Sequence, residues 1–332
     1  MTAGGRRVLV TGVGGFVGGH VADFLAAQRP AAEVFGIVRR GGDALRARGV
    51  TVLTADLEDG PATDAVIDQV RPDRILHLAG QSSVHRSWED PGGTLRANVQ
   101  GLLNVLEALR RRSLTPRVLV VGSAEEYGAV QAERLPVVER TRLQPASPYA
   151  VSKVAQAYLA RQYFLSHGVP VICTRTFHHT GPGRGEVFAE SSFARQIAEI
   201  EAGRQPAVLS VGNLDAVRDF TDVRDVVRAY WLLLEKGRAG ETYNVCSGRG
   251  IAIGDVLQEL LDVSGVAIEV RRDPERMRPS DIPAIIGNPK KLRDATGWTP
   301  EIPLRQTLAD LLAHWRRESQ AAAAPASPRA RR

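Results

Sequence analysis

The sequence predicts an α/β protein in which a doubly wound parallel sheet of the Rossmann type is followed by a smaller C-terminal α/β lobe. Three observations predict this fold. Short apolar runs alternate with helical patterns, a glycine-rich loop joins the first run to the first helix, and turn signals become denser after about residue 177. With 332 residues, 43% of them apolar, the chain can bury a sizeable core.

The expected strands are apolar at almost every position, as strands covered on both faces of a parallel sheet are. They lie at 7–11, 33–39, 51–55, 74–79, 117–122 and 169–176. Helical spacing separates them, most clearly at 18–28, 95–111 and 150–167. Alternation at this spacing predicts parallel strands joined by crossover helices.

The second half is organised differently. Turn signals stand at Gly181-Pro182-Gly183, Gly212-Asn213 and Ser247-Gly248, between helical stretches at 193–202, 223–236 and 253–263. We expect a first domain over 1–177 and a lobe over 178–318 that covers the carboxyl edge of the sheet, with the chain free to cross between them. An Ala/Pro/Arg tail over 319–332 is expected to be disordered.

Composition excludes several classes of function. The net charge is +6, but Arg329, Arg331 and Arg332 supply about half of it, and no basic run is interleaved with aromatics, so nucleic acid is not expected as a partner. A membrane span is not expected, since no apolar stretch reaches about 18 residues. Cys173 and Cys246 lie in apolar runs, which argues against a disulfide scaffold. Without a signal-peptide pattern, the expected location is the cytoplasm.

The glycine-rich loop Thr11–Gly18 has the context of a dinucleotide-binding fingerprint, since a strand precedes it and a helix follows. Gly12 permits a tight turn, Gly15 lets the backbone approach a pyrophosphate, and Gly18 lets the helix pack on the strand. The residues that start the helix, Phe16 and Val17, would offer backbone N–H groups to phosphate oxygens. A merely flexible turn is the alternative.

The second strand ends at Arg39-Arg40, where an NAD enzyme usually has an acidic residue for the ribose 2′-hydroxyl. Arginine there accommodates a 2′-phosphate, so NADP(H) is favoured and NAD(H) is the alternative. Two arginines that merely solvate a strand end would look the same. Asp56-Leu57 follows the third strand, where a carboxylate could reach the adenine amino group or form a surface turn.

Tyr149 and Lys153 are four residues apart and therefore share one face of a helix. A lysine cation one turn away should lower the tyrosine pKa from about 10 and make the phenol a usable acid or base. Ser123 ends the fifth strand at the sheet's carboxyl edge, where its hydroxyl could bond a reacting oxygen. The adjacent Glu125 and Glu126 form either a solvated pair or include a general base. Together these features suggest a nicotinamide-dependent enzyme acting on a carbinol or carbonyl.

Other polar positions are ambiguous. His77 lies within a strand and is expected to be a core histidine. His178 and His179 follow the sixth strand, but adjacent histidines point different ways and no third ligand is evident, so no metal is expected. Arg218, in the charged segment 218–225, and Arg278, in 277–281, could clamp a diphosphate.

These segments resemble the extended short-chain dehydrogenase/reductase family over nearly the whole chain, to about residue 316. Within that family the chain is most similar to the sugar-nucleotide branch that includes the GDP-4-keto-6-deoxy-D-mannose reductases of the GDP-D-rhamnose-forming type. The resemblance rests on 11–18, 78–81, 122–128, 147–153, 218–225, 243–248 and 296–300. One departure is His178-His179, where these proteins usually have Asn-His, which puts sugar and nucleotide preference in question.

The resemblance implies hydride transfer from NADPH to the C-4 ketone of a nucleotide-linked 4-keto-6-deoxyhexose, on a GDP or dTDP carrier. Tyr149 would protonate the oxygen, Ser123 would hold it, and Lys153 would bind the nicotinamide ribose and keep Tyr149 acidic. The same resemblance places further residues at the cofactor, namely Leu78, Ala79, Gly80 and Thr176. It places others at the sugar nucleotide, namely Gln81, Ala124, His178, Arg218, Arg278 and Asp281.

Three alternatives stay open at this point. A sugar-nucleotide 4,6-dehydratase of the GDP-mannose type would need an additional acid/base carboxylate, and Glu125 occupies such a place. A 4-epimerase would reuse the same residues, and a non-catalytic NADP sensor would need no proton donor. We also expect a homodimer formed through 95–111 and 150–161, with Leu102, Leu103, Leu106, Val154 and Tyr158 as contact residues.

Overall fold

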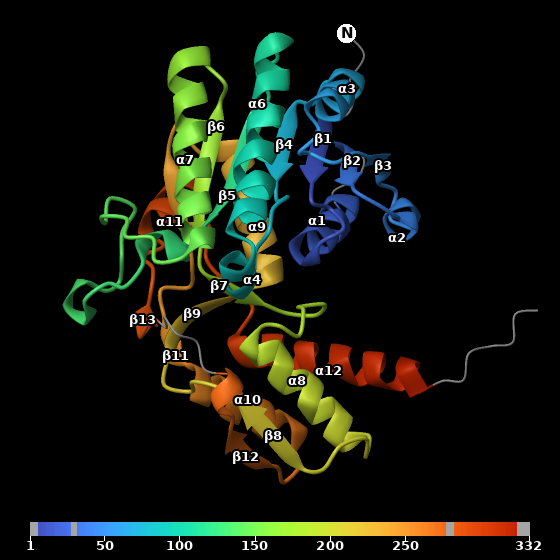
Figure 1. The fold of residues 1–332 in the computed structure, drawn as a ribbon, viewed down its shortest axis with the longest axis vertical. Helices are drawn as coiled ribbons and strands as arrows, with labels where there is room; N and C mark the ends of the chain where they lie inside the picture. The colour runs from blue at the N-terminus through green and yellow to red at the C-terminus, as the bar shows by residue number, and fades with distance from the viewer. Residues whose placement is uncertain (1–5, 28–31, 277–281, 324–332) are drawn as a thin grey trace, which may run out of the picture.

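Seven parallel strands form the main sheet (Figure 1). The structure, a computed structural model, describes residues 6–27, 32–276 and 282–323. In spatial order the strands are β10 (Thr242–Val245), β6 (Val171–Thr176), β5 (Arg117–Ser123), β4 (Arg74–His77), β1 (Arg6–Thr11), β2 (Ala32–Val38) and β3 (Thr51–Thr54). All six strands predicted from apolar runs are present, and the doubly wound α/β class is confirmed. The sheet's seventh strand, β10, was not foreseen.

Helices cover both faces of this sheet. One face carries α1 (Phe16–Ala27), α9 (Val223–Lys236) and, at its edge, α11 (Lys290–Thr296). The other face carries α3 (Gly60–Val70), α6 (Gly101–Arg111) and α7 (Pro148–His167). Short elements connect them, namely α2 (Asp43–Ala47), α4 (Val84–Glu89), α5 (Pro91–Leu95) and the single-turn helices η2 (Ala124–Tyr127) and η3 (Ala132–Arg134).

The smaller unit lies below the main sheet in Figure 1 and has its own core. Its helices are α8 (Ala189–Glu201), α10 (Ile253–Ser264), α12 (Leu304–Ala323) and the short η4 (Pro274–Arg276). Its strands are β7 (His178–Thr180), β8 (Val208–Val211), β9 (Val217–Asp222), β11 (Gly250–Ala252), β12 (Glu269–Arg272) and β13 (Ala284–Ile285). Strand β9 is the centre of the larger of its two sheets, because β7, β11 and β13 all pair with it.

The chain crosses between the two units more than once. After β9 it returns to the main sheet through α9 and β10, and later through α11. The prediction of disorder over 319–332 is wrong for its first residues, because α12 continues to Ala323 and Ser319 is buried, with its hydroxyl donating to Glu199 at 3.1 Å. Residues 324–332 lie outside the described part of the chain.

The helix expected over 95–111 is not regular. A π-helical turn, η1 (Arg96–Gln100), separates α5 from α6. By contrast, α7 is one helix of 20 residues whose ends follow local rules. The hydroxyl of Ser147 caps it by accepting from the N–H of Ala150, Pro148 occupies its first turn, and Gly168 ends it in a left-handed conformation. Its first turns carry Tyr149 and Lys153.

The expected dimer contacts are only partly on the surface. Leu102 and Leu106 are fully buried between α6 and the sheet, so the prediction that they face a partner is wrong. Leu103 and Val154 are half-buried, and Tyr158 is 62% exposed. Among the described helices, none has the length and apolar character needed to span a bilayer.

Candidate active site

The glycine loop between β1 and α1 forms a tight backbone cradle. Gly12 has φ +71°, and a Cβ there would lie 2.8 Å from the amide nitrogen of Ala79. A Cβ on Gly18 would lie 2.4 Å from the carbonyl oxygen of Gly12. Gly15 is exposed, directly before Phe16 and Val17 at the start of α1. Larger residues would therefore fill the space in which the loop and helix approach β4, while the loop's outer side stays open for phosphates.

The ends of β2, β3 and β4 lie along the same edge of the sheet. Arg39 and Arg40 are exposed just after β2. Asp56 is exposed after β3, where its Oδ1 accepts from the N–H of Glu58 at 3.0 Å. Leu57, in contrast, is buried in the core, so only its backbone can face a ligand.

The turn after β4 is held by the π-helical turn. Leu78 and Ala79 are half-buried and Gly80 is exposed. The buried Asn98 of η1 accepts from the N–H of Gln81 at 2.7 Å and donates to its carbonyl at 3.1 Å. The Gln81 side chain donates to Ser83 and to Thr94, so it also shapes this loop, and its role as a substrate contact stays a prediction.

Three of the four residues predicted to be catalytic come together at the edge of the sheet, and the fourth, Glu125, is described below. Ser123, Tyr149 and Lys153 are all buried, with at most 8% of each exposed. The Ser123 hydroxyl is near enough to the Tyr149 phenol to lower its pKa. The Lys153 Nζ donates to the carbonyl of Val121 on β5 at 3.0 Å and lies 5.9 Å from the centre of the Tyr149 ring.

The predicted direction of the Tyr149 pKa shift is wrong in this structure. Burial raises the pKa of Tyr149 to about 12, opposed by the nearby Ser123 hydroxyl and the charge of Arg184, and reinforced by Glu125 and Glu126. Burial also lowers the pKa of Lys153 to about 8. Since burial disfavours each charged form, the phenol is held protonated.

The two adjacent carboxylates have different surroundings. Glu126 is fully buried, where its Oε2 accepts from Arg175 Nε at 2.8 Å and its Oε1 accepts from the N–H of Ser123 at 2.9 Å. Glu125 is half-buried and close enough to Tyr149 to affect its pKa. Glu126 therefore holds the strand end that carries Ser123, and Glu125 is the acid to consider in chemistry.

The remaining predicted residues are dispersed around this edge. Ala124 is buried beside Ser123. The Thr176 hydroxyl bonds to Tyr230 of α9 at 2.8 Å, so this side chain faces the core and only its backbone can meet a cofactor. His178 is half-buried against Phe220, and the buried Arg218 donates to the carbonyl of Ile282 at 2.7 Å. Arg278 and Asp281 lie outside the described residues.

His77 is a core histidine, as predicted. It is buried, its Nδ1 lies 3.0 Å from the Thr11 hydroxyl, and burial lowers its pKa to about 3. The described residues contain no group of three or more His, Cys, Asp or Glu side chains placed to hold a metal ion.

Sequence reasoning missed two residues at this site. Asn98 also donates to the hydroxyl of Ser152, next to Lys153, at 2.8 Å. Arg184, in the loop between β7 and α8, stacks on Phe16 and acts electrostatically on Tyr149. No pattern in the sequence marks either residue, because each reaches the site through long-range packing.

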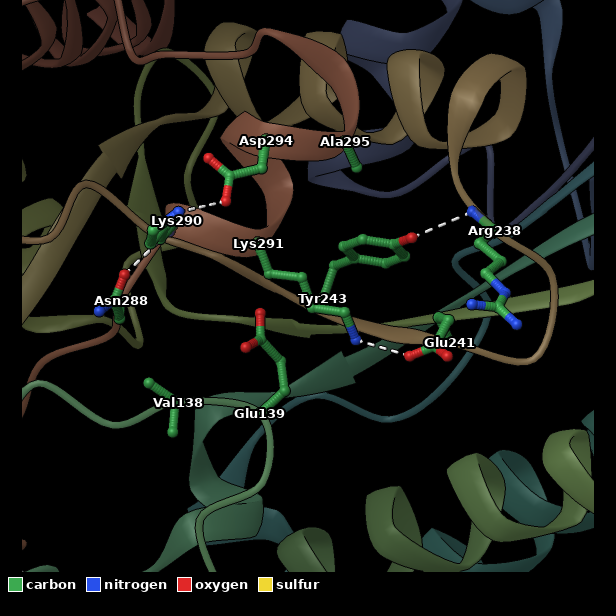
Figure 2. Close-up of a pocket in the computed structure, with 10 residues that line it drawn as sticks. All are labelled: Val138, Glu139, Arg238, Glu241, Tyr243, Asn288, Lys290, Lys291, Asp294 and Ala295. Atoms are coloured by element: carbon green, nitrogen blue, oxygen red, sulfur yellow. Dashed lines mark hydrogen bonds and ion pairs between the residues drawn. The ribbon is translucent and has the colours of Figure 1, made fainter.

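A pocket of about 550 Å³ lies elsewhere, at the outer edge of β10 (Figure 2). Among its lining residues, Lys291 pairs with Glu241 at 2.8 Å, and Lys290 pairs with Asp294. None of the predicted site residues lines this pocket. Its charged groups largely satisfy one another, so we assign the chemistry to the glycine loop and Tyr149.

Comparisons with known proteins agree with this assignment. The family described as GDP-mannose 4,6 dehydratase matches residues 9–311. A GDP-6-deoxy-D-mannose reductase of Pseudomonas aeruginosa is 38% identical over 310 residues, covering 93% of this chain and 97% of that protein. A GDP-mannose 4,6-dehydratase of Vibrio cholerae is 30% identical over 352 residues, covering 92% and 93%.

A solved structure agrees as well. The structure of RMD from Pseudomonas aeruginosa complexed with NADPH superposes with a TM-score of 0.85 at 37% identity, covering 94% of this chain and 99% of that one. The similarity extends over nearly the whole length of both chains. This protein therefore belongs to the GDP-mannose 4,6-dehydratase family, within the sugar-nucleotide branch of the extended short-chain dehydrogenases/reductases.

Proposed function

We propose that this protein reduces the C-4 ketone of a nucleotide-linked 4-keto-6-deoxyhexose with NADPH. The substrate that we favour is GDP-4-keto-6-deoxy-D-mannose, which would give GDP-D-rhamnose, with a dTDP-linked counterpart as the alternative. The observation that carries the proposal is the buried cluster of Ser123, Tyr149 and Lys153 at the edge of the sheet, in a chain that is 38% identical to a GDP-6-deoxy-D-mannose reductase. The phenol of Tyr149 can donate a proton to a carbonyl oxygen as hydride is added to the carbon.

Each residue then has a definite task. The hydroxyl of Ser123 would hydrogen bond the C-4 oxygen and orient it toward Tyr149 Oη. Tyr149 would transfer its proton to that oxygen as negative charge develops there. Lys153, fixed by Val121 and lying beside the turn after β4, would bind the hydroxyls of the nicotinamide ribose and stabilise the phenolate that proton transfer leaves.

The residues present fit NADPH. Gly12 and Gly18 leave no room for a Cβ, so the loop can approach a diphosphate with its backbone, and α1 begins directly after it. Arg39 and Arg40 are exposed at the end of β2, where they would bind the 2′-phosphate. When bound, NADPH supplies the hydride for C-4.

A 4,6-dehydratase is the second candidate, because the matching family is described by that activity and Glu125 lies near Tyr149. Such an enzyme would convert GDP-mannose to its 4-keto-6-deoxy product without net consumption of cofactor. We expect the purified protein to consume NADPH and GDP-4-keto-6-deoxy-D-mannose one to one, and to leave GDP-mannose unchanged, as measured by absorbance and mass spectrometry. Water elimination from GDP-mannose would overturn the proposal in favour of the dehydratase.

We infer that the enzyme acts as a homodimer in the cytoplasm. Val151, Tyr158 and Leu165 are exposed at intervals of seven residues along α7, so they share one face of the helix, and Leu95 is exposed on α5. An apolar stripe of this kind is typical of a helix that packs against another protein.

The cytoplasm would supply NADPH and would keep Cys173 and Cys246, both buried and unpaired, reduced.

A further inference from the structure

Glu126 and Arg175 form a buried ion pair at the carboxyl end of β5. Their side chains are 0% and 8% exposed, and Glu126 Oε2 accepts from Arg175 Nε at 2.8 Å. The other carboxylate oxygen accepts from the backbone N–H of Ser123 at 2.9 Å. A Cβ on Gly122 would lie 2.3 Å from this oxygen, so glycine at that position leaves room for the carboxylate. The ion pair is therefore built into the strand end that carries Ser123.

Arg175 is itself held in place by several contacts. From β6 its Nη1 donates to the carbonyl of Glu139 at 2.8 Å and to the hydroxyl of Tyr127 at 3.2 Å. Its guanidinium carbon lies 4.9 Å from the centre of the Tyr127 ring. The Tyr127 hydroxyl donates in turn to Asn244 Oδ1 on β10 at 2.7 Å. These contacts fix the guanidinium so that its Nε points at Glu126.

The charge of Glu126 is more than its local structural task requires. Glu126 and Ser123 form a capping box at the start of η2. Glutamine serves in such a box as glutamate does, and a buried ion pair is often no more stabilising than uncharged residues of similar size. A buried charge at this position is therefore expected to act on a further group.

That group is the ammonium of Lys153. Burial lowers the pKa of Lys153 to about 8, and the charge of Glu126 opposes this fall. Other titratable groups around the two residues are uncharged near pH 8, because burial lowers the pKa of His77 on β4 to about 3 and raises those of Cys173 on β6 and Tyr149 on α7 to about 12. Among the described residues, Glu126 is therefore the anion that acts on Lys153.

Glu126 depends on Arg175 for its own charge. Burial raises the pKa of Glu126, and the charge and the hydrogen bond of Arg175 oppose that rise. Without this partner, a carboxyl group at so buried a site would be neutral.

We propose that Arg175 keeps Glu126 ionised, and that Glu126 then acts as a positioning residue, fixing Ser123 through its backbone N–H and keeping Lys153 cationic. The proposal rests on the proposed function for the roles of Ser123 and Lys153. In that function the ammonium would bind the nicotinamide ribose and stabilise the Tyr149 phenolate, so a neutral Lys153 would impair both tasks.

The test measures the pKa of Lys153 without ligand or turnover. The free energy of urea unfolding is compared between each protein and the same protein carrying Lys153→Met, from about pH 6 to pH 10.5. Because the folded pKa of the lysine lies below the unfolded one, this difference changes between the two values, and the lower end of the window gives the folded pKa. The backgrounds are the wild type, Glu126→Gln, Arg175→Met, Arg175→Lys and the double variant Glu126→Gln/Arg175→Met.

We expect Glu126→Gln to lower the folded pKa of Lys153 by about one unit or more. Arg175→Met should lower it similarly, because Glu126 becomes protonated, and Arg175→Lys, which keeps a cation, should largely restore it. Direct repulsion between Arg175 and Lys153 would give the opposite sign, since removing a cation raises a lysine pKa. Glu201→Gln is the matched control and should cause no shift, because this carboxylate pairs with Arg316 at 2.7 Å between α8 and α12.

The double variant leaves no unpaired buried charge, so it decides the question if a single variant does not fold, and it should show the same lowered pKa. With substrate, the alkaline limb of the kcat profile of Glu126→Gln should move to lower pH by the same amount, which a merely structural role would not cause. An unchanged Lys153 pKa in Glu126→Gln or in the double variant, or a raised one in Arg175→Met, would overturn the proposal. A wild type without reductase activity would count against the proposed function, and the unfolding measurements would still decide whether Glu126 acts on Lys153.

Discussion

The burial of Lys153 predicts how the substitution Lys153→Met changes stability with pH. Burial lowers the pKa of Lys153 from 10.5 to about 8, which at about 1.4 kcal/mol per pH unit corresponds to about 3 kcal/mol against the charged form in the folded protein. Between these two values the unfolded chain binds more protons than the folded one, so wild-type stability should rise with pH across that window. Methionine has no such titration.

At about pH 7, Lys153→Met is relieved of the charge penalty but leaves the carbonyl of Val121 without its 3.0 Å hydrogen bond, a loss of about 1–3 kcal/mol. The variant should therefore be as stable as the wild type or slightly more so, although it is expected to be inactive. By pH 10.5 the wild-type lysine is neutral when folded, and the stability of the variant relative to the wild type should have fallen by about 3 kcal/mol.

Urea unfolding of both proteins, from about pH 7 to pH 10.5, measures this difference, and titrations common to both proteins cancel in it. Lys236→Met is the control for the loss of a lysine, because Lys236 is exposed on α9. A constant difference for Lys153→Met would refute the argument that the amine is buried and destabilised.

Four further predictions follow from the site. Tyr149→Phe should lower kcat roughly 10²–10⁴-fold with little change in NADPH affinity, measured by steady-state kinetics and calorimetry; near-normal turnover would exclude Tyr149 as the proton donor. Replacing Arg39 and Arg40 with serine should raise the KM for NADPH at least about tenfold and leave that for NADH almost unchanged, and equal use of both cofactors by the wild type would contradict the assignment. Glu125→Gln should retain much of the reductase activity, whereas loss of a water-eliminating activity in this variant would identify a dehydratase. Tyr158→Arg should convert the dimer to a monomer in light scattering at micromolar concentration, and a wild type that is already monomeric would refute the dimer.

The strands of the main sheet could be predicted because their apolar runs are continuous and bounded by turns. Strand β10 could not, since Thr242–Val245 is short and contains a buried asparagine, Asn244, whose side chain bonds to Tyr127 and to Val137. The π-helical turn η1 could not be predicted either, because its signal lies in long-range contacts. Apolar spacing over 95–111 suits one regular helix, and the turn is revealed only by where Asn98 bonds after folding.

For the candidate site too, local spacing could be predicted from the sequence, but properties that depend on long-range packing could not. Spacing correctly placed Tyr149 and Lys153 on one helix face, but the sign of the Tyr149 pKa shift depends on how much water reaches the phenol, which depends on the whole fold. Arg184 was missed because a loop arginine beside glycine and proline resembles a surface residue until its burial between Phe16 and Phe188 is seen.

The pair Glu125-Glu126 explains why adjacent residues of one type need separate treatment. The Glu126 carboxylate accepts from Arg175, 49 residues later in the chain, and from the backbone N–H of Ser123. Its charge therefore stabilises the end of β5. That long-range partner leaves Glu125 as the carboxylate beside Tyr149, where it raises the phenol's pKa and favours the protonated form. In a reductase this effect favours reprotonation of the Tyr149 phenol between turnovers. In a dehydratase the same carboxylate would take a proton from C-5 of the sugar. The two activities therefore assign different roles to the charge of Glu125, and the activity that remains in Glu125→Gln distinguishes these roles.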